Sequence, residues 1–196
     1  MKVWKEKEFM EHDQWFHATT LEGFKSILKN GILASFNNDI ELDFGYGFYL
    51  TPNKEWAYKY AKGLYTDSES VVIEFRFKPK DIANGCKSKF YGKLDTEFAD
   101  FVFNNRQYFM NNETHCVHDY DIVGGVMSDG NQWEDFELYR NGTIDKNELY
   151  KRLCIPKEDW QIVIHSQELC NKIKPFSAKG TKGGVYDVKN YRKAYS

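Results

Sequence analysis

The 196-residue sequence lacks several features that mark large classes of protein. It has no apolar run of about 18 residues, so no membrane-spanning helix is expected. The first residues, Met-Lys-Val-Trp-Lys-Glu, are charged and do not resemble a secretory signal peptide. No two cysteines form a C-x-x-C pair; they are Cys86, Cys116, Cys154 and Cys170. This spacing predicts reduced thiols in a cytoplasmic protein.

A charge excess of one sign is also missing from the chain as a whole. Lys and Arg number 27 and Asp and Glu number 29, which argues against a protein built mainly to coat nucleic acid. Aromatic residues make up 17% of the chain, which argues against disorder. The charge is nevertheless uneven, because residues 171–196 contain seven Lys or Arg and one Asp.

The sequence predicts one domain over residues 1–174 and a basic C-terminal tail over residues 175–196. The run Lys179-Gly180-Thr181-Lys182-Gly183-Gly184 indicates that this tail is flexible. A basic tail can bind an acidic partner or nucleic acid, or it can be an ordinary solvated terminus. No internal repeat or low-complexity block is present elsewhere.

Short strand-like and helix-like stretches alternate along the body of the chain. Alternating or continuous apolar residues predict strands at 14–18, 47–51, 71–77, 120–127 and 161–165. Helical spacing predicts helices at 21–30, from 52 through Tyr60, at 95–108 and at 144–153, and a helical turn through Leu169. The elements do not follow a regular βαβ period, so the predicted class is α+β.

The first candidate functional residue is His17, at the end of the first predicted strand. Such a position lets a side chain reach a ligand while the backbone stays anchored. Thr19 lies two residues on and shares its face if the strand continues. The alternative is a partly buried histidine with a local hydrogen bond.

The second candidate is the segment Asp43-Phe44-Gly45-Tyr46-Gly47-Phe48-Tyr49-Leu50-Thr51. Its two glycines allow the backbone to approach a ligand closely. Tyr49 and Tyr60, eleven residues apart, can form a slot for a flat aromatic ring. The segment is not a dinucleotide fingerprint, because G-x-G-x-x-G is absent. A glycine-rich hairpin with core aromatics is the alternative.

Further candidates lie in the second half of the chain. Asp159 and Gln161 share a face if the late strand begins there, although polar residues are also common at strand ends. Arg106 can bind a diphosphate in bidentate fashion, or pair with Asp121 or another acid. His115-Cys116-Val117-His118 has ligand chemistry without a closed four-ligand spacing, and no metal is predicted.

Taken together, the order and spacing of these residues resemble the ADP-ribosyltransferase superfamily. The closest pattern is the diphtheria-toxin and poly(ADP-ribose) polymerase type, with its His–Tyr–Glu signature. The segment at Tyr49, the Asn-Arg ending at Arg106, the Tyr-Asp-Ile-Val strand and the late Gln161 are similar to a bacterial and phage branch. The resemblance covers residues 12 to 172. It implies two split antiparallel sheets with flanking helices and an NAD cleft between them.

The resemblance also implies a role for each matching residue. His17 would hydrogen-bond the adenosine-side ribose of NAD. The backbone of Ala18, where the family usually has glycine, would contact the nicotinamide amide, with support from Thr19. Tyr49 and Tyr60 would sandwich the nicotinamide ring. Gly47 and Arg106 would complete the NAD contacts.

Gln161 stands where the family has its catalytic glutamate. A glutamine keeps the hydrogen bonds to ribose but lacks the charge that stabilises an oxocarbenium-like transition state. Asp159 is the nearest acid that can compensate, and in related toxins this position contacts the acceptor. Glu158 is a weaker candidate. Loss of the glutamate argues against elongation to poly(ADP-ribose).

The expected function is therefore mono-ADP-ribosylation of a macromolecule, with NAD as substrate and nicotinamide as product. A protein is the first expected acceptor, and nucleic acid is a second. Such a transferase would be a toxin, an effector carried by a phage or a housekeeping enzyme, and it would act in the cytoplasm of a bacterium or of a target cell. The alternatives are an NAD glycohydrolase and an inactive module that binds NAD, ADP-ribose or a protein surface.

Overall fold

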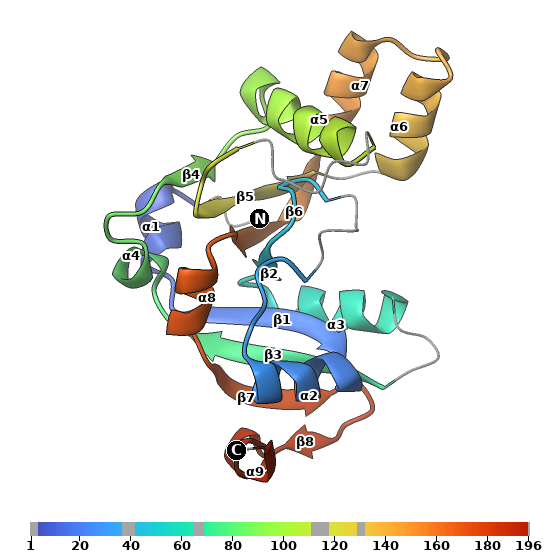
Figure 1. Ribbon diagram of the computed structural model, residues 1–196. Coiled ribbons are helices and arrows are strands. Elements are labelled where there is room, and N and C mark those ends of the chain that lie inside the picture. The colour runs from blue at the N-terminus through green and yellow to red at the C-terminus, as the bar shows by residue number, and fades with distance from the viewer. Residues whose placement is uncertain (1–3, 37–41, 65–68, 111–117, 129–131, 196) are drawn as a thin grey trace.

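The computed structural model describes residues 4–36, 42–64, 69–110, 118–128 and 132–195, and it contains two four-stranded sheets (Figure 1). The strands are β1 (Gln14–Thr20), β2 (Phe48–Leu50), β3 (Ser70–Arg76), β4 (Ser88–Tyr91), β5 (Ile122–Ser128), β6 (Pro156–Ile164), β7 (Pro175–Gly180) and β8 (Val185–Tyr186). The helices are α1 (Glu6–Glu11), α2 (Leu21–Asn30), α3 (Lys54–Leu64), α4 (Pro79–Ile82), α5 (Thr96–Met110), α6 (Gln132–Arg140), α7 (Lys146–Leu153), α8 (Gln167–Lys172) and α9 (Val188–Tyr195).

The predicted α+β class is confirmed by the arrangement of these elements. Sheet A has the order β1-β3-β7-β8, with antiparallel neighbours throughout. Sheet B has the order β2-β6-β5-β4. The expectation of purely antiparallel sheets is wrong at one pair, because β4 and β5 run parallel. Helix α5 lies between these two strands in the chain, and such a crossover connection joins parallel strands.

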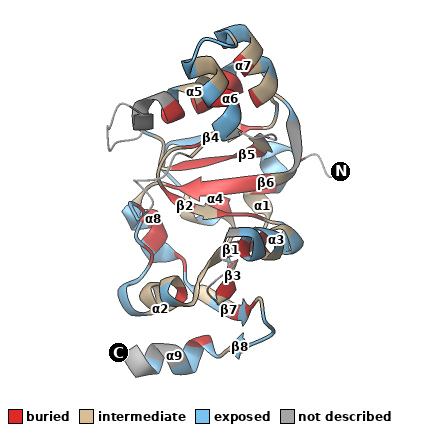
Figure 2. Cartoon of the chain, turned by 90° about the vertical axis from the view of Figure 1, so that its right-hand side faces the viewer, coloured by how far each residue is buried: buried red, intermediate tan, exposed pale blue. Residues whose placement is uncertain are grey.

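The largest apolar cluster lies between the two sheets. Trp15, Ile73 and Phe75 of sheet A belong to the same cluster as Phe48 and Ile162 of sheet B. Figure 2 shows β5 and β6 buried over most of their length. Burial of apolar surface on this scale is the dominant force that holds the two sheets together.

Helix α3 covers the opposite face of sheet A. Ala57 and Ala61 of this helix form a separate cluster with Phe16 of β1 and Val72 of β3. The small alanine side chains let the helix approach the sheet closely. Because α3 follows β2 after only three residues, this packing also ties sheet A to sheet B.

Local signals account for the helices that the sequence predicted. The side chain of Thr20 accepts a hydrogen bond from the backbone N–H of Gly23 and caps α2. Gly31 ends this helix with a φ of 81°, a conformation that suits glycine. In α5, Phe98 and Val102 are buried as expected.

The predicted flexible tail at residues 175–196 is wrong. Residues 175–180 form β7, which lies between β3 and β8 inside sheet A. Gly183 has a φ of 95° and lies in the turn that joins β7 to β8. Val188 of α9 is buried in the cluster between the sheets. The glycines therefore form a turn, and the apolar positions among the lysines hold this segment on the domain.

Helix α6 was not predicted from the sequence. Its residues carry a weak apolar stripe, and only Phe136 among its apolar residues is fully buried. None of the helices in the described part of the chain has the length and apolar character that a membrane crossing requires. Cys86, Cys154 and Cys170 are free thiols, and Cys116 lies outside the described residues.

Candidate functional site

Strands β1 and β2 lie where the two sheets meet. Phe16 and Thr51 exchange two backbone hydrogen bonds, of 2.8 and 2.9 Å. Beside this bridge, Nδ1 of His17 lies 2.8 Å from the carbonyl oxygen of Tyr49. The same ring packs against Phe48 with centroids 4.4 Å apart. The structure therefore brings His17 and the backbone of Tyr49 together.

The contact with Tyr49 fixes the protonation of His17. A carbonyl oxygen can only accept, so Nδ1 carries the hydrogen. Burial lowers the pKa of His17 to about 4, although the bond to Tyr49 acts in the opposite direction. At neutral pH the ring is therefore uncharged and its Nε2 is a hydrogen-bond acceptor. An acceptor of this kind suits a hydroxyl group of a ligand.

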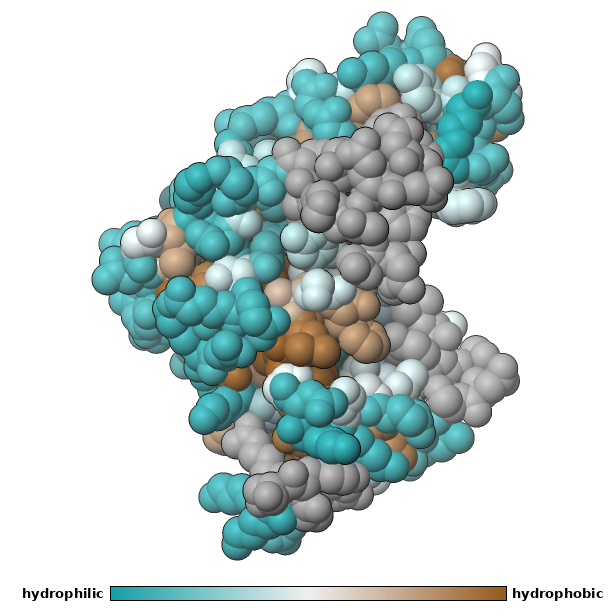
Figure 3. Space-filling model, in the orientation of Figure 1, coloured by the Kyte–Doolittle hydropathy of each residue, from teal (hydrophilic) through white to brown (hydrophobic). Residues whose placement is uncertain are grey.

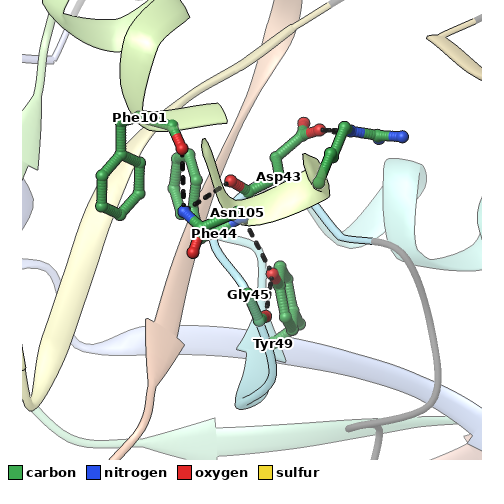
Figure 4. Close-up of polar contacts among 7 residues, drawn as sticks. Asp43, Phe44, Gly45, Tyr49, Phe101 and Asn105 are labelled. Carbon is green, nitrogen blue, oxygen red and sulfur yellow. Dashed lines mark hydrogen bonds and ion pairs between the residues drawn. The ribbon is translucent and has the colours of Figure 1, made fainter. Parts of the chain in front are cut away.

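The side chain of Tyr49 folds back onto the loop that precedes β2 (Figure 4). Its hydroxyl donates to the carbonyl oxygen of Gly45 at 2.7 Å and accepts from the backbone N–H of Phe44 at 3.2 Å. Gly45 has a φ of 76°, which a residue with a side chain rarely adopts. The phenol therefore closes a compact loop, and the prediction of a ring that stacks on a ligand stays a prediction.

Gly47 allows this loop to lie against β6. A Cβ at this position would collide with the Val163 side chain and lie 3.1 Å from the carbonyl oxygen of Ile164. The glycine was predicted to let the backbone approach a ligand. In this structure it lets the backbone approach a neighbouring strand, which also explains why a glycine is required.

Asp43, at the start of the loop, forms a buried ion pair with Arg106 of α5. The Arg106 guanidinium donates to Asp43 Oδ1 from Nε at 3.0 Å and from a terminal nitrogen at 2.8 Å. Asn105 donates to the carbonyl oxygens of Asp43 and Phe101 (Figure 4). Of the two roles predicted for Arg106, the structure contains the ion pair, and its partner is Asp43 rather than Asp121.

Three histidines contact carbonyl oxygens of this one segment. His17 binds the carbonyl of Tyr49, His118 that of Phe44 at 3.2 Å, and His165 that of Tyr46 at 2.5 Å. The rings of His118 and His165 also meet edge to face, with centroids 4.6 Å apart. Sequence reasoning missed the roles of His118 and His165, because nothing local to either residue indicates which carbonyl it binds.

Acid is expected to destabilise the protein through these buried imidazoles. Burial and the neighbouring His118 lower the pKa of His165 to about 3, whereas an unfolded histidine titrates near 6.5. The unfolded state therefore binds more protons below pH 6.5, and the free energy of unfolding falls as the pH drops from 6.5 toward 3. The variant His165→Asn keeps a side-chain donor but does not titrate. Urea unfolding from pH 7 to 4 should show a shallower decline for this variant than for wild type, and equal declines would contradict the assignment.

Gln161 lies on β6, opposite Gly125 of β5, and is 7% exposed. Tyr49 of β2 pairs with Val163 of β6, and Val163 lies two residues after Gln161 on β6. Tyr49 and Gln161 therefore share a face of sheet B. The strand begins at Pro156, earlier than predicted, which places Asp159 on the Gln161 face as expected. The side chain of Glu158 lies outside the described residues.

Asn53 connects Asp159 to helix α3, a role that sequence reasoning missed. Its side-chain nitrogen donates to Asp159 Oδ1 at 2.6 Å, and its side-chain oxygen accepts from the backbone N–H of Trp56 at 3.1 Å. The second contact caps α3. An asparagine before a predicted helix was the available signal, but its partner is 106 residues away.

The remaining residues predicted for the site are Ala18 and Thr19 on β1 and Tyr60 on α3. Ala18 pairs with Val72 of β3 and packs toward α3. Thr19 continues β1 and shares the face of His17, as expected. Tyr60 is 43% exposed on α3, with its ring centroid 6.3 Å from that of Trp56. Tyr60 lies seven positions after Asn53 along the helix, a rise of about 10 Å.

The possible metal ligands do not form a cluster within the described residues, where no group of three or more His, Cys, Asp or Glu could hold a metal ion. His118 contacts Phe44 and His165 instead. Residues 115–117 lie outside the described ranges.

Comparison with known families gives a match over most of the chain. A family described as "Protein of unknown function (DUF3990)" matches residues 28–174, three quarters of the chain. The chain belongs to this family. No curated protein and no solved structure matches the chain. The DUF3990 match contains β2, Tyr60, Arg106 and Gln161, and it leaves out β1 with His17 and the segment from β7 onward.

Proposed function

We propose that the chain is a mono-ADP-ribosyltransferase that uses NAD to modify a macromolecule. The observation that carries the proposal is the contact of His17 with the Tyr49 carbonyl, at the junction of the two sheets. A half-buried, neutral imidazole with an acceptor nitrogen suits a ribose hydroxyl. Gln161 lies on the adjoining strand, on the face of Tyr49.

The residues would divide the work between binding and bond cleavage. His17, with the backbone of Ala18 and with Thr19, would hold the nucleotide, while Tyr49 and Tyr60 would bind the nicotinamide ring. The amide of Gln161 would hold a hydroxyl of the nicotinamide-side ribose. None of these contacts requires a metal ion or a second cofactor.

The reaction would exchange one bond for another at the ribose. The bond between ribose C1 and the nicotinamide nitrogen breaks, and its electron pair leaves with nicotinamide. The acceptor forms the new bond to C1 and releases a proton, for which the Asp159 carboxyl group is the nearby base. Asn53 orients that carboxyl group through a hydrogen bond of 2.6 Å. With water as the acceptor the same steps give free ADP-ribose.

The first test is incubation with NAD labelled on its adenylate group, together with a bacterial lysate. Labelled macromolecules and free nicotinamide are the expected products. The variants His17→Ala and Tyr60→Ala should each lower nicotinamide release by about 10²-fold, because a misplaced substrate reacts far more slowly. Release is measured by chromatography.

The matched control is Trp133→Ala, which removes an exposed aromatic side chain from α6. Its rate should equal that of wild type. Free ADP-ribose without a labelled macromolecule would identify a glycohydrolase instead. If folded wild-type protein neither releases nicotinamide nor labels the lysate, transferase activity is ruled out under these conditions.

One observation favours a second candidate, an NAD-binding module without turnover. Gln161 is buried and carries no charge, whereas the resemblance puts a carboxylate at this position to stabilise positive charge. Calorimetry with NAD separates the two candidates. Heat of binding without nicotinamide release would support the module, and His17→Ala should then abolish the binding.

A further inference from the structure

The two halves of the molecule carry opposite charge. The elements of sheet A and its helices α2, α3 and α9 lie within residues 14–36, 52–64, 69–77 and 174–195. These segments contain 12 Lys or Arg and five Asp or Glu. The remainder of the chain contains 15 Lys or Arg and 24 Asp or Glu. The small net charge of the whole chain therefore conceals a basic half built on sheet A.

Within the basic half, the outward face of α3 combines lysines with aromatic rings. Lys54, Lys59 and Lys62 are exposed, and Tyr60 between them is 43% exposed. Lys59 Nζ lies 5.6 Å from the ring centroid of Trp56, which in turn contacts Tyr60. The single acid on this helix is Glu55. Ala57 and Ala61 of α3 face the sheet, and Tyr58 packs beside them. Lys54, Lys59, Tyr60 and Lys62 are exposed, and Trp56 is partly exposed.

Strand β7 extends this surface beside the helix. Lys179 pairs with Val72, which packs under α3, so Lys179 lies on the α3 side of sheet A. Lys179 is exposed, and the buried cluster under α3 consists of residues of β1, β3 and α3 itself. Across the described residues, Lys54, Lys59, Lys62 and Lys179 form no ion pair with an acid of the chain.

On the face that Figure 3 draws, hydrophilic side chains predominate among the described residues, apart from an apolar patch near the middle of the molecule. A charged surface alone would fit any anion. Here the lysines alternate with Trp56 and Tyr60. In a nucleic acid each base lies beside a phosphate, so an aromatic ring can stack on the base while a neighbouring lysine binds the phosphate. An acidic peptide has no flat group at each charge, so the aromatic rings favour nucleic acid over an acidic protein.

We propose that the α3 surface, formed by Lys54, Trp56, Lys59, Tyr60, Lys62 and Lys179, binds single-stranded nucleic acid. Its lysines contact successive phosphates, and its aromatic rings stack on unpaired bases. A duplex keeps its bases inside the helix and offers only the phosphates. The surface therefore prefers single strands, without a strong preference for sequence.

The α3 surface begins at the candidate site. Asn53 caps the first turn of α3 and also binds Asp159, two residues from Gln161. A strand bound along α3 thus reaches the edge of the candidate site. Tyr60 belongs to both proposed sites, but nucleic-acid binding does not rest on the proposed transferase activity, since it requires neither NAD nor Gln161.

The test measures the fluorescence anisotropy of a labelled 20-nucleotide single-stranded DNA with the full chain, without NAD, between 50 and 200 mM salt. Four phosphate contacts predict a loss of affinity of about 50-fold over this range. The variant Lys54→Ala/Lys59→Ala/Lys62→Ala should bind more weakly and lose only about threefold over the same range. Tyr60→Ala should weaken single-strand binding by about tenfold and leave duplex binding nearly unchanged.

The matched control is Lys25→Ala/Lys29→Ala/Lys189→Ala, which removes the same charge from α2 and α9. These helices pack through Phe24 and Val188 into the cluster between the sheets, on the side of sheet A away from α3 (Figure 2). The control should bind like wild type. Equal losses in both triple variants, or no binding by wild-type protein, would overturn the proposal. Competition by poly-L-glutamate as effective per charge as the oligonucleotide would also overturn it, in favour of an acidic protein partner.

Discussion

Gln161→Glu is expected to release nicotinamide from NAD about 10² to 10³ times faster than wild type. The substitution replaces a neutral amide by a carboxyl group of nearly the same volume on the same strand. In the proposed reaction, a carboxylate at this point would stabilise the positive charge that develops on the ribose as nicotinamide leaves. One well-placed electrostatic group is worth about 2.7–4 kcal/mol in the transition state. The rate is measured under saturating NAD, so that binding and turnover are separated.

Two further variants show whether the gain comes from the proposed site. Gln161→Glu combined with His17→Ala should lose the gain, because the substrate is no longer held. Gln161→Ala should show no gain at all. A folded Gln161→Glu protein that binds NAD in calorimetry and turns over no faster than wild type would mean that residue 161 does not face the reacting ribose.

Arg106→Met is expected to lower the free energy of unfolding by about 3–5 kcal/mol, the largest stability effect among these predictions. The side chains of Arg106 and Asp43 are only 10% and 12% exposed, so the change leaves a buried carboxylate without its counter-charge. Asp43 begins the loop before β2, and the Tyr49 hydroxyl holds the same loop through hydrogen bonds to Phe44 and Gly45. Urea unfolding at neutral pH gives the difference directly.

Arg76→Met is the matched control on a surface ion pair. The Arg76 side chain is 54% exposed, and its partner Glu74 also accepts hydrogen bonds from Gln14 and Ser177. The expected loss is below about 1 kcal/mol. Asp43→Asn combined with Arg106→Met should recover part of the large loss, because it removes the orphaned charge. If the single and double variants were equally unstable, the cost would come from packing rather than charge.

The fold could be predicted from the sequence wherever local signals decide. Thr20 caps the first turn of α2 and Gly31 ends it, so both signals are local in the sequence. The spacing of the apolar residues in α5 predicts which of its faces is buried. Strand β7 lacked such a signal, because its lysines and glycines resemble a linker until β3 is beside it. The parallel pair β4–β5 also depends on tertiary structure, since pairing direction follows from the path of the chain.

The candidate site could be predicted only in part, for the same physical reason. The resemblance named His17, Tyr49 and Gln161, and these residues lie on adjoining strands. The sequence did not indicate that Arg106 pairs with Asp43, because 63 residues separate them and several acids were equally plausible partners. Hydrogen bonds between distant segments depend on the folded geometry, which no single-sequence pattern contains.

The three imidazoles on the segment around Tyr49 also constrain the order in which the chain folds. His17 lies 32 positions along the chain from Tyr49, His118 lies 74 positions from Phe44, and His165 lies 119 positions from Tyr46. Closing chain loops of such different lengths carries an entropic cost that must be met before each contact forms. We therefore expect the segment to reach its final conformation late, because His17 lies on β1, His118 lies shortly before β5 and His165 directly follows β6. Its amide hydrogens should gain protection against exchange late in refolding, after those of the three strands.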